Sequence, residues 1–401
     1  MKITWICTAF FCFAVLIQLS SYSNETIEVE ILKKNVQNEV ILIQDGIPSK
    51  DETDKEVIQN KTENDKKTIL FWNSYWDWRH FQMGVGNRGF KKCPNFGNCY
   101  TTTLRSKLFN PSEKIDAIVF HGVGLKIEEI QALKAERAKI PKLNHGVEPV
   151  FVLFMLESPM GANLTSSVFD DFFNLTFTYR SSADVSRPYG AIVENRRQQL
   201  KPVNFDDDVI NSRPKDIAWV VSHCETENHR EDFVEAMKKA NSSLKIDIFG
   251  KCAAQPAPEL PDGAEAYQEI AKTHKFYLSF ENSNCFEYVT EKFFNALKYG
   301  LIPIVYGGLT SQDYAEIAPP NSFIYAEDFS SPELLMKELE RISSDSEILN
   351  SYLAWHSSYE VKTTELEHPT QCQFCDILND HTFKSTNDYG NFKEYWHKCR
   401  T

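Results

Sequence analysis

The chain has 401 residues and a formal net charge of −13, and 42% of its residues are hydrophobic. This length is enough for two globular domains, each with its own core. The negative charge excludes a general nucleic-acid binder, because there is no broad basic field to attract phosphate backbones.

The first predicted element is the apolar run "ITWICTAFFCFAVLIQLS" at residues 3–20. A helix of about 17 residues rises ~26 Å, which suits a thin endomembrane bilayer. We therefore expect residues 1–2 to be a cytosolic tail and residues 3–20 a signal-anchor transmembrane helix, with the rest of the chain in the lumen. The alternative is a cleaved signal peptide that ends at "SYS", residues 21–23.

Residues 21–67 follow as a polar segment, which contains no aromatic residue after Tyr22. Such a composition buries too little apolar surface to offset the entropy that is lost on ordering. We therefore expect a flexible luminal stem.

Two features agree with a luminal location for residues 24–401. Eight of the ten cysteines lie after residue 20, and in an oxidising compartment cysteines form disulfides more often than metal sites. N-glycosylation sequons occur at Asn24, Asn60, Asn163, Asn174 and Asn241.

Residues 68–205 are predicted to form a first α/β domain. The apolar runs at 68–72, 116–120 and 149–155 are typical of buried strands, and residues 126–140 have helical spacing. Strands of this kind that alternate with helices predict a parallel sheet covered on both faces.

Residues 206–360 repeat this alternation and are predicted to form a second domain. Its expected strands are 216–222, 244–250, 275–280 and 301–308, and its expected helices are 228–240, 263–272, 290–300 and 331–342. The sequence therefore predicts two Rossmann-like domains, whose ligands bind beyond the carboxyl ends of the strands. Residues 361–401 look irregular.

The segment "ENSNCFEYVTEK", residues 281–292, is unexpectedly polar for a link between a buried strand and a helix. The N-terminus of that helix attracts anions, and Lys292 adds a positive charge there. Glu291 offers acceptors for a vicinal diol, and Tyr288 offers a flat ring and a hydroxyl. These groups suit a nucleoside diphosphate; the alternative is a solvated helix start with ordinary surface charges.

The sequence "FENSNCFEYVTEKFFNALKYGLIPIVYGG", residues 280–308, closely resembles the signature of the α1,3-fucosyltransferases, the family of the Lewis-type and N-glycan-core enzymes. The resemblance runs from about residue 68 to residue 399. It includes "DAIVFH" (116–121), "MLESPMG" (155–161), "FNLTFTYRSSADVSRPYG" (173–190), "AWVVSHCETENHREDF" (218–233), "KIDIFGKC" (245–252) and "CQFC" (372–375).

The resemblance implies a GT-B architecture, in which an acceptor domain at 68–205 and a GDP-fucose domain at 206–360 face a cleft. It implies an inverting enzyme that transfers L-fucose from GDP-fucose to O3 of a GlcNAc residue.

The resemblance also implies roles for single residues. Glu157 occupies the position of the family's general base; the alternative is that Glu157 is a loop carboxylate that caps the next turn. Arg230 and Lys292 are expected to bind the diphosphate, and Glu291 is expected to bind the ribose. The nucleotide pocket is expected to be completed by Ser222, Asn282 and Tyr288. Without the resemblance, Arg230 would be read as a surface residue of an amphipathic helix.

The resemblance also implies that residues 361–401 are linked by disulfides to the start of the acceptor domain. The expected bonds are Cys93–Cys372 and Cys99–Cys375, or the crossed pairing. The spacing alone would also permit a Cys₄ zinc site. The sequence does not pair the remaining cysteines, which are Cys224, Cys252, Cys285 and Cys399.

No tightly bound metal is expected. The acidic run Asp206–Asp208 imitates a manganese motif, but we interpret it as an acidic linker between the domains. Mn²⁺ can still stimulate the reaction by binding free GDP or diffuse carboxylates.

Two features bear on the acceptor. His121 matches a family histidine near the acceptor site, although Gly122 stands where many relatives carry a second histidine; a structural role for His121 is the alternative. The cluster of Trp72, Trp76 and Trp78 could stack on a sugar or belong to the core.

Together these features predict a single-pass type II Golgi membrane enzyme that acts on GlcNAc-containing glycoprotein or oligosaccharide acceptors, with a preference for N-glycan cores. A relative with a different donor or linkage, and a catalytically inactive glycan-binding relative, are the alternatives.

Overall fold

The computed structural model describes residues 2–8, 11–17, 66–74, 81, 83–93, 98–143, 146–162, 164–195, 210–254, 259–363 and 369–400. The chain forms two compact units, residues 1–59 and residues 60–401. In the first unit, β1 (Lys2–Thr8) and β2 (Phe11–Ile17) pair as antiparallel strands.

The transmembrane helix expected at residues 3–20 is therefore not seen. Among the described residues, none of the helices combines the length and the apolar character needed to cross a bilayer. The run is rich in β-branched and aromatic residues, and these residues favour strands. Apart from residues 66 and 67, the predicted stem lies outside the described residues, as does the predicted boundary between the two domains at residues 205 and 206.

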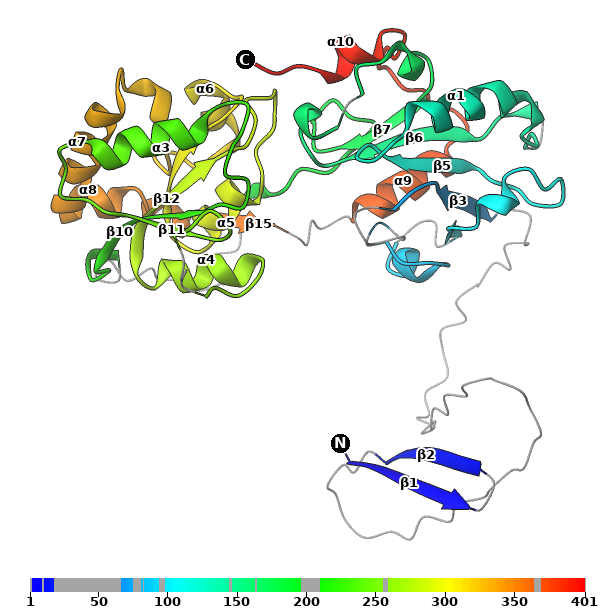
Figure 1. Cartoon of the computed structure of the whole chain (residues 1–401), viewed down its shortest axis with the longest axis horizontal. Coiled ribbons are helices and arrows are strands. Elements are labelled where there is room, and N and C mark those ends of the chain that lie inside the picture. Colours follow the sequence, from blue (N-terminus) through cyan, green and yellow to red (C-terminus); the bar gives the residue numbers. More distant parts are fainter. Residues whose placement is uncertain are drawn as a thin grey trace. The chain divides into compact units, whose positions relative to one another are not determined.

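The N-terminal lobe, residues 66–195, contains a six-stranded parallel sheet with the order β4-β3-β5-β6-β7-β8 (Figure 1). Its strands are β3 (Lys67–Phe71), β4 (Cys99–Thr102), β5 (Ala117–His121), β6 (Val150–Met155), β7 (Leu175–Thr178) and β8 (Val185–Ser186). All five residues of β5 are buried, as expected for a strand with both faces covered. Helix α1 (Ile127–Glu136) adds Ile130 and Leu133 to the core.

The C-terminal lobe, residues 210–363, contains a five-stranded parallel sheet with the order β11-β10-β12-β13-β14 (Figure 1). Its strands are β10 (Lys215–Val220), β11 (Ile246–Phe249), β12 (His274–Phe280), β13 (Ile302–Tyr306) and β14 (Ile324–Tyr325). Its helices are α3 (Arg230–Lys239), α4 (Ala264–Ala271), α5 (Glu291–Lys298), α6 (Ser311–Ile317), α7 (Pro332–Ser344) and α8 (Ser346–Ser351).

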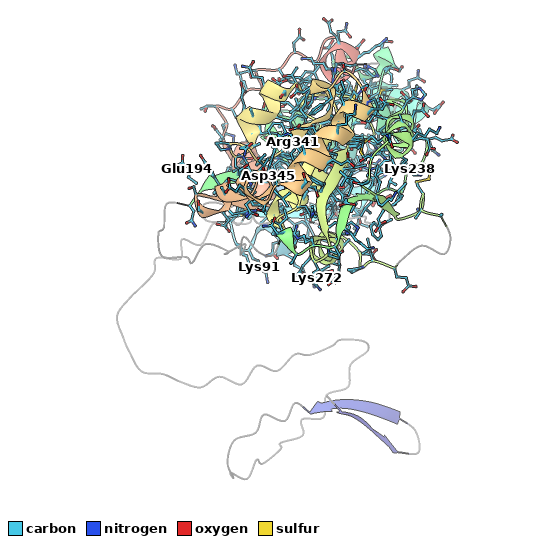
Figure 2. The ribbon with its side chains drawn as sticks, turned by 90° about the vertical axis from the view of Figure 1, so that its left-hand side faces the viewer. Lys91, Glu194, Lys238, Lys272, Arg341 and Asp345 are labelled. Atoms are coloured by element: carbon cyan, nitrogen blue, oxygen red, sulfur yellow. A yellow bond between two sulfur atoms is a disulfide. The ribbon has the colours of Figure 1, made fainter. Side chains whose placement is uncertain are left out.

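Helices α3 and α7 share one apolar cluster with the C-terminal sheet, and α4 and α5 contribute to another. Charged side chains such as Lys238, Lys272 and Arg341 are exposed on the outside of this lobe (Figure 2). The predicted α/β class with two parallel, Rossmann-like sheets is thus confirmed.

The prediction that residues 361–401 are irregular was wrong, because they include helices α9 (Thr370–Asn379) and α10 (Phe392–Trp396). Helix α9 packs on the N-terminal lobe, where Phe374, Cys375 and Leu378 join the core of the sheet. Short helices of this kind depend on tertiary packing more than on their own propensity, so their sequence carries a weak signal.

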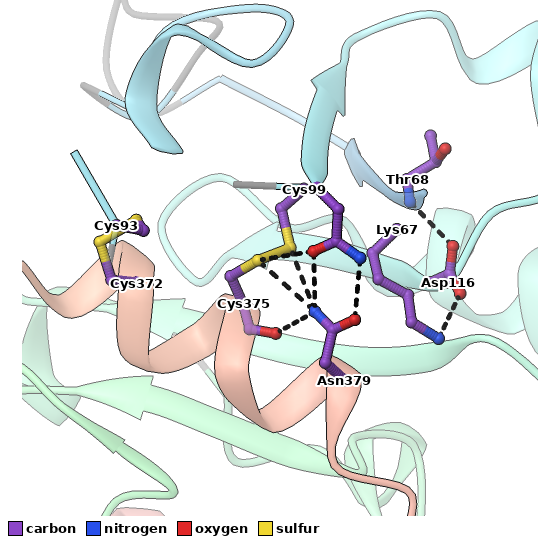
Figure 3. The surroundings of a disulfide bond; sticks show 9 residues. Lys67, Thr68, Cys93, Cys99, Asp116, Cys372, Cys375 and Asn379 are labelled. Atoms are coloured by element: carbon purple, nitrogen blue, oxygen red, sulfur yellow. Dashed lines mark hydrogen bonds and ion pairs between the residues drawn. A yellow bond between two sulfur atoms is a disulfide. The ribbon is translucent and has the colours of Figure 1, made fainter. Parts of the chain in front are cut away.

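Two disulfides fix α9 to the N-terminal lobe. They are Cys93–Cys372 and Cys99–Cys375, the uncrossed form of the expected pairing. Figure 3 shows α9 beside the Cys99–Cys375 bond, close to the start of β3, where Lys67 lies 3.4 Å from Asp116. The remaining cysteines form Cys224–Cys252 and Cys285–Cys399.

The two lobes are also joined by short strands. β9 (Ala191–Glu194), at the end of the N-terminal lobe, pairs antiparallel with β15 (Tyr359–Lys362) of the C-terminal lobe. Immediately before β9, the backbone at Gly190 passes so close to α5 that a Cβ there would lie 2.4 Å from Cγ of Phe294. Glycine at position 190 therefore allows the exit chain to lie against α5.

Candidate active site

The site begins at the carboxyl end of β12, where the β12–α5 loop, residues 281–290, leads to the N-terminus of α5. Its first residue, Glu281, is 1% exposed. One carboxylate oxygen of Glu281 accepts hydrogen bonds from the backbone N–H of Thr290 at 2.8 Å and from its hydroxyl at 2.9 Å. The carboxylate therefore accepts hydrogen bonds from donors at the start of the helix, and it joins the first residue of the loop to the last.

Lys292 places a positive charge at the same helix terminus. Its Nζ lies 3.1 Å from a carboxylate oxygen of Glu281 and 3.2 Å from one of Glu291, and donates to the hydroxyl of Thr290 at 2.8 Å. Burial acts to lower the pKa of Lys292, but the carboxylates of Glu281 and Glu291 raise it above its usual value. The ammonium group is therefore charged and held in place, and the side chain of Lys292 is 17% exposed.

Arg230 reaches the same strand end from the first position of α3. Its guanidinium donates to the carbonyl oxygens of Phe280 at 2.5 Å and His223 at 3.2 Å. The residue is 2% exposed, and burial lowers its pKa. Arg230 contacts Phe280 and Lys292 contacts Glu281, so both cations lie at the end of β12. Arg230, however, is buried, and its guanidinium binds main-chain carbonyls.

The other predicted nucleotide-binding residues lie nearer the surface. Ser222 is exposed just beyond β10, and the side chain of Glu291 is 48% exposed. Asn282 is partly buried, and its Oδ1 accepts a hydrogen bond of 3.4 Å from Ser283. Of these three side chains, that of Glu291 lies beside Lys292, with a carboxylate oxygen 3.2 Å from Nζ.

Glu157 comes from the other lobe, two residues after the end of β6. Its Oε2 accepts a hydrogen bond of 3.2 Å from the hydroxyl of Tyr288 in the β12–α5 loop. The predicted general base and the predicted nucleotide loop are therefore in direct contact. The hydroxyl of Tyr288 bonds to Glu157, and the nucleotide-binding role that the resemblance implied for Tyr288 stays a prediction.

The C-terminal residues of the chain contact the β12–α5 loop, and the sequence did not predict this contact. Cys399 forms a disulfide with Cys285 of the β12–α5 loop. On either side of that bond, Phe286 N donates to Lys398 O and Arg400 N donates to Asn284 O, both at 2.7 Å. The sequence left four cysteines without an assigned partner, and two of them, Cys285 and Cys399, are 114 positions apart.

The same tail is held by the N-terminal lobe. The buried guanidinium of Arg180 donates to the carbonyl oxygens of Tyr395 at 2.8 Å and Trp396 at 2.5 Å. Residues 395–400 therefore bind both lobes beside the candidate site.

His121 is a buried residue at the end of β5 and is 1% exposed. Its Nδ1 lies 3.1 Å from the carbonyl of Ser74, and its backbone N–H donates to Oδ1 of Asn73 at 2.8 Å. Burial lowers the pKa of His121 to about 4, so the ring is neutral at physiological pH. These contacts favour its structural role, and an acceptor role stays a prediction.

Trp72 has neighbours around its ring. The guanidinium of Arg105 lies 4.2 Å from the ring centroid, and the ring of Phe120 lies 5.6 Å away. This arrangement favours packing over sugar stacking. Trp76 and Trp78 lie outside the described residues.

No group of three or more His, Cys, Asp or Glu side chains that could hold a metal occurs in the described part of the chain. Asp206–Asp208 lie outside it, as do the sequons at Asn24, Asn60 and Asn163. The sequons at Asn174 and Asn241 are on exposed residues.

Two family profiles match the chain. The one described as "Glycosyltransferase family 10 (fucosyltransferase) C-term" covers residues 210–395, and "Fucosyltransferase, N-terminal" covers residues 64–190.

Among curated proteins, the chain is similar to "Alpha-(1,3)-fucosyltransferase C" of Drosophila melanogaster, with 30% identity over 83% of this chain and 79% of that protein. It is also 30% identical to "4-galactosyl-N-acetylglucosaminide 3-alpha-L-fucosyltransferase 9" of Mus musculus, over 75% of this chain and 76% of that protein. Among solved structures, one described as "Crystal Structure of alpha1,3-Fucosyltransferase" aligns with a TM-score of 0.48 and 14% identity, over 82% of this chain and 95% of that one.

Proposed function

Because the chain belongs to glycosyltransferase family 10, we propose that it is an inverting α1,3-fucosyltransferase of the GT-B type. It moves L-fucose from GDP-fucose to O3 of a GlcNAc residue on a glycoprotein glycan. The observation that carries the proposal is the contact between Glu157 of one lobe and the β12–α5 loop, which leads to Lys292. The carboxylate of Glu157 thereby contacts the loop that leads to a cationic, anion-binding helix terminus.

The donor binds at the carboxyl edge of the C-terminal sheet. Lys292 and the N-terminus of α5 hold the diphosphate, and Glu291 accepts hydrogen bonds from the ribose hydroxyls. Arg230 adds a buried positive charge below the diphosphate, and Ser222 and Asn282 complete the nucleotide pocket. Cations fixed before the reaction stabilise the charge that develops on the leaving group.

Transfer is a single in-line displacement. The acceptor O3–H gives its proton to Glu157, and the oxygen forms a bond to C1 of fucose. The bond from C1 to the β-phosphate oxygen breaks, and its electron pair leaves with GDP. One displacement inverts C1, and a positioned base contributes about 10²- to 10⁴-fold to such a rate.

We place this reaction in the Golgi lumen. Four disulfides in the described residues support an oxidising compartment. The apolar run at 3–20 is proposed to attach the enzyme to the Golgi membrane as a type II protein. Carbonate extraction of membranes tests this attachment, because release of the full-length chain into the supernatant would contradict it.

The proposed acceptor is the N-glycan core. The test is a transfer assay with the full-length protein, radiolabelled GDP-fucose and a panel of core and antenna glycans, with GDP-mannose as a competing donor. We expect fucose on O3 of GlcNAc. Transfer from GDP-mannose would favour the relative with another donor. Binding of GDP-fucose without any transfer would favour the inactive relative.

A further inference from the structure

The loop after β6 is attached to the β12–α5 loop at two consecutive residues. Glu157 accepts the hydroxyl hydrogen bond of Tyr288 at 3.2 Å. The next residue, Ser158, shares a hydrogen bond of 2.8 Å with Ser283, and both serines are buried. Two contacts of this kind fix the orientation of the β6 loop better than one, because each removes a different rotation.

Tyr288 is itself held rigidly. It is 2% exposed, and its ring centroid lies 5.2 Å from that of Tyr179 and 6.5 Å from that of Tyr189. Its backbone N–H donates to the carbonyl of Cys285 at 3.1 Å. Burial raises the pKa of Tyr288 well above its usual value, so its hydroxyl keeps its proton and can donate.

The backbone around Glu157 is constrained as well. The hydroxyl of Tyr189 donates to the carbonyl of Leu156, the preceding residue, at 2.6 Å. Oε1 of Glu157 makes no hydrogen bond to any described residue, whereas Oε2 is bonded to Tyr288. One carboxylate oxygen is therefore fixed, and the other remains open.

We propose that Tyr288 is a positioning residue for fucosyl transfer: its hydroxyl holds Oε2 of Glu157 so that Oε1 faces the acceptor hydroxyl. The loop that leads to the donor-binding Lys292 thereby also orients the base, and both reactants are aligned by one structural element. This inference rests on the proposed function, in which Glu157 is the general base.

The first test substitutes Tyr288→Phe in the full-length enzyme, which removes only the hydroxyl. A base that loses its orientation lowers the rate of the chemical step, so we expect kcat to fall about 10- to 100-fold. The KM for GDP-fucose and the Kd of GDP are expected to stay within about twofold, because the change removes an interaction that acts on transfer rather than on donor binding.

Tyr179→Phe is the matched control. Tyr179 is a buried neighbour of Tyr288, and its hydroxyl has no hydrogen-bond partner among the described residues. We expect near wild-type kinetics. A loss equal to that of Tyr288→Phe would mean that packing of the tyrosines, rather than the bond to Glu157, supports the activity, and it would overturn the inference.

A double-mutant cycle tests whether Tyr288 acts through Glu157. In a Glu157→Gln background, single-turnover assays are expected to show no further loss when Tyr288→Phe is added, because the base is already absent. A loss that multiplies with that of Glu157→Gln would overturn the inference.

GDP binding separates the two levels of the proposal and also reports folding. If Tyr288→Phe weakens GDP binding as much as it lowers kcat, Tyr288 belongs to the nucleotide pocket and only the inference fails. If Glu157→Gln transfers fucose at the wild-type rate, the proposed base itself fails. Ser283→Ala gives a second variant, for which we expect a smaller fall in kcat at unchanged GDP affinity.

Discussion

Lys292 is largely buried, and two carboxylates stabilise its positive charge there. The ammonium group contacts Glu281 and Glu291, so these two carboxylates hold it in place until an anionic ligand arrives. A diphosphate can therefore take over the contact to Lys292 while Glu281 remains bonded to Thr290. Such an exchange keeps the loop closed in both states.

The first prediction concerns this lysine. Lys292→Ala should weaken GDP binding by at least about tenfold and lower kcat as well, because a charge-assisted contact to phosphate is lost. Isothermal titration with GDP and a transfer assay measure both effects. Lys298→Ala, an exposed lysine at the other end of α5, is the control and should retain GDP binding; wild-type affinity in Lys292→Ala would remove Lys292 from the phosphate site.

His121 supports a prediction about stability and pH. Its folded-state pKa of about 4 lies below the value of about 6.5 in an unfolded chain. The unfolded state therefore binds more protons between these values, so stability is present above pH 6.5 and is lost as the pH falls towards 4. The full difference corresponds to on the order of 3 kcal/mol.

His121→Gln should therefore reduce the loss of unfolding free energy between pH 7 and pH 4 relative to the wild type. Urea unfolding of both proteins at several pH values in this window measures the difference. Parallel pH profiles for the two proteins would show that the buried imidazole does not contribute in this way.

Helix α5 is positioned by the chain that leaves the N-terminal lobe. Gly190→Ala would place a Cβ 2.4 Å from Cγ of Phe294, so α5 or the exit chain must shift. We expect a cost of about 1–3 kcal/mol, as for other overpacked sites, together with weaker GDP binding. Gly390→Ala is the control for thermal unfolding, because its Cβ would meet only the ends of the Asp388 and Asp171 side chains, at 3.1 and 3.8 Å. Equal effects of the two changes would contradict this interpretation.

Strands were easier to predict than the elements that hold the site together. β5, β6 and β12 are apolar runs that are buried on both faces, so their composition alone indicates them. β4, with the sequence CYTT, and the two-residue β8 are too short and too mixed to give a pattern. α9 was missed because its burial depends on the N-terminal sheet and on two disulfides.

The site was predictable only in part, for a related reason. The motif after β12 made Lys292 and Glu291 candidates, since they are adjacent and begin a helix. The contact between Tyr288 and Glu157 joins residues 131 positions apart, and the contact of Arg230 with Phe280 depends on the burial of both elements. Local sequence carries no information about such pairings.

The C-terminal segment returns to the N-terminal lobe, so the disulfides there act on the whole molecule. Cys93–Cys372 and Cys99–Cys375 span 279 and 276 residues. On the chain-entropy model, a single bond that closes so long a loop contributes about 5 kcal/mol, but a second bond beside it closes only a short extra loop and adds about 3 kcal/mol.

We therefore predict a non-additive response. Replacing either pair by serines should cost about 3 kcal/mol, and replacing both should cost clearly more than twice that, because the long loop then opens. Thermal unfolding of the two single-pair variants and the combined variant measures the costs. Strictly additive losses would contradict this account of the disulfides.

The decisive measurement compares Glu157→Gln with the wild-type full-length enzyme for both GDP binding and fucose transfer from GDP-fucose. We expect GDP to bind with nearly wild-type affinity while transfer falls by at least about 10²-fold, because the donor site is intact and the base is gone. Transfer at the wild-type rate in Glu157→Gln would contradict it.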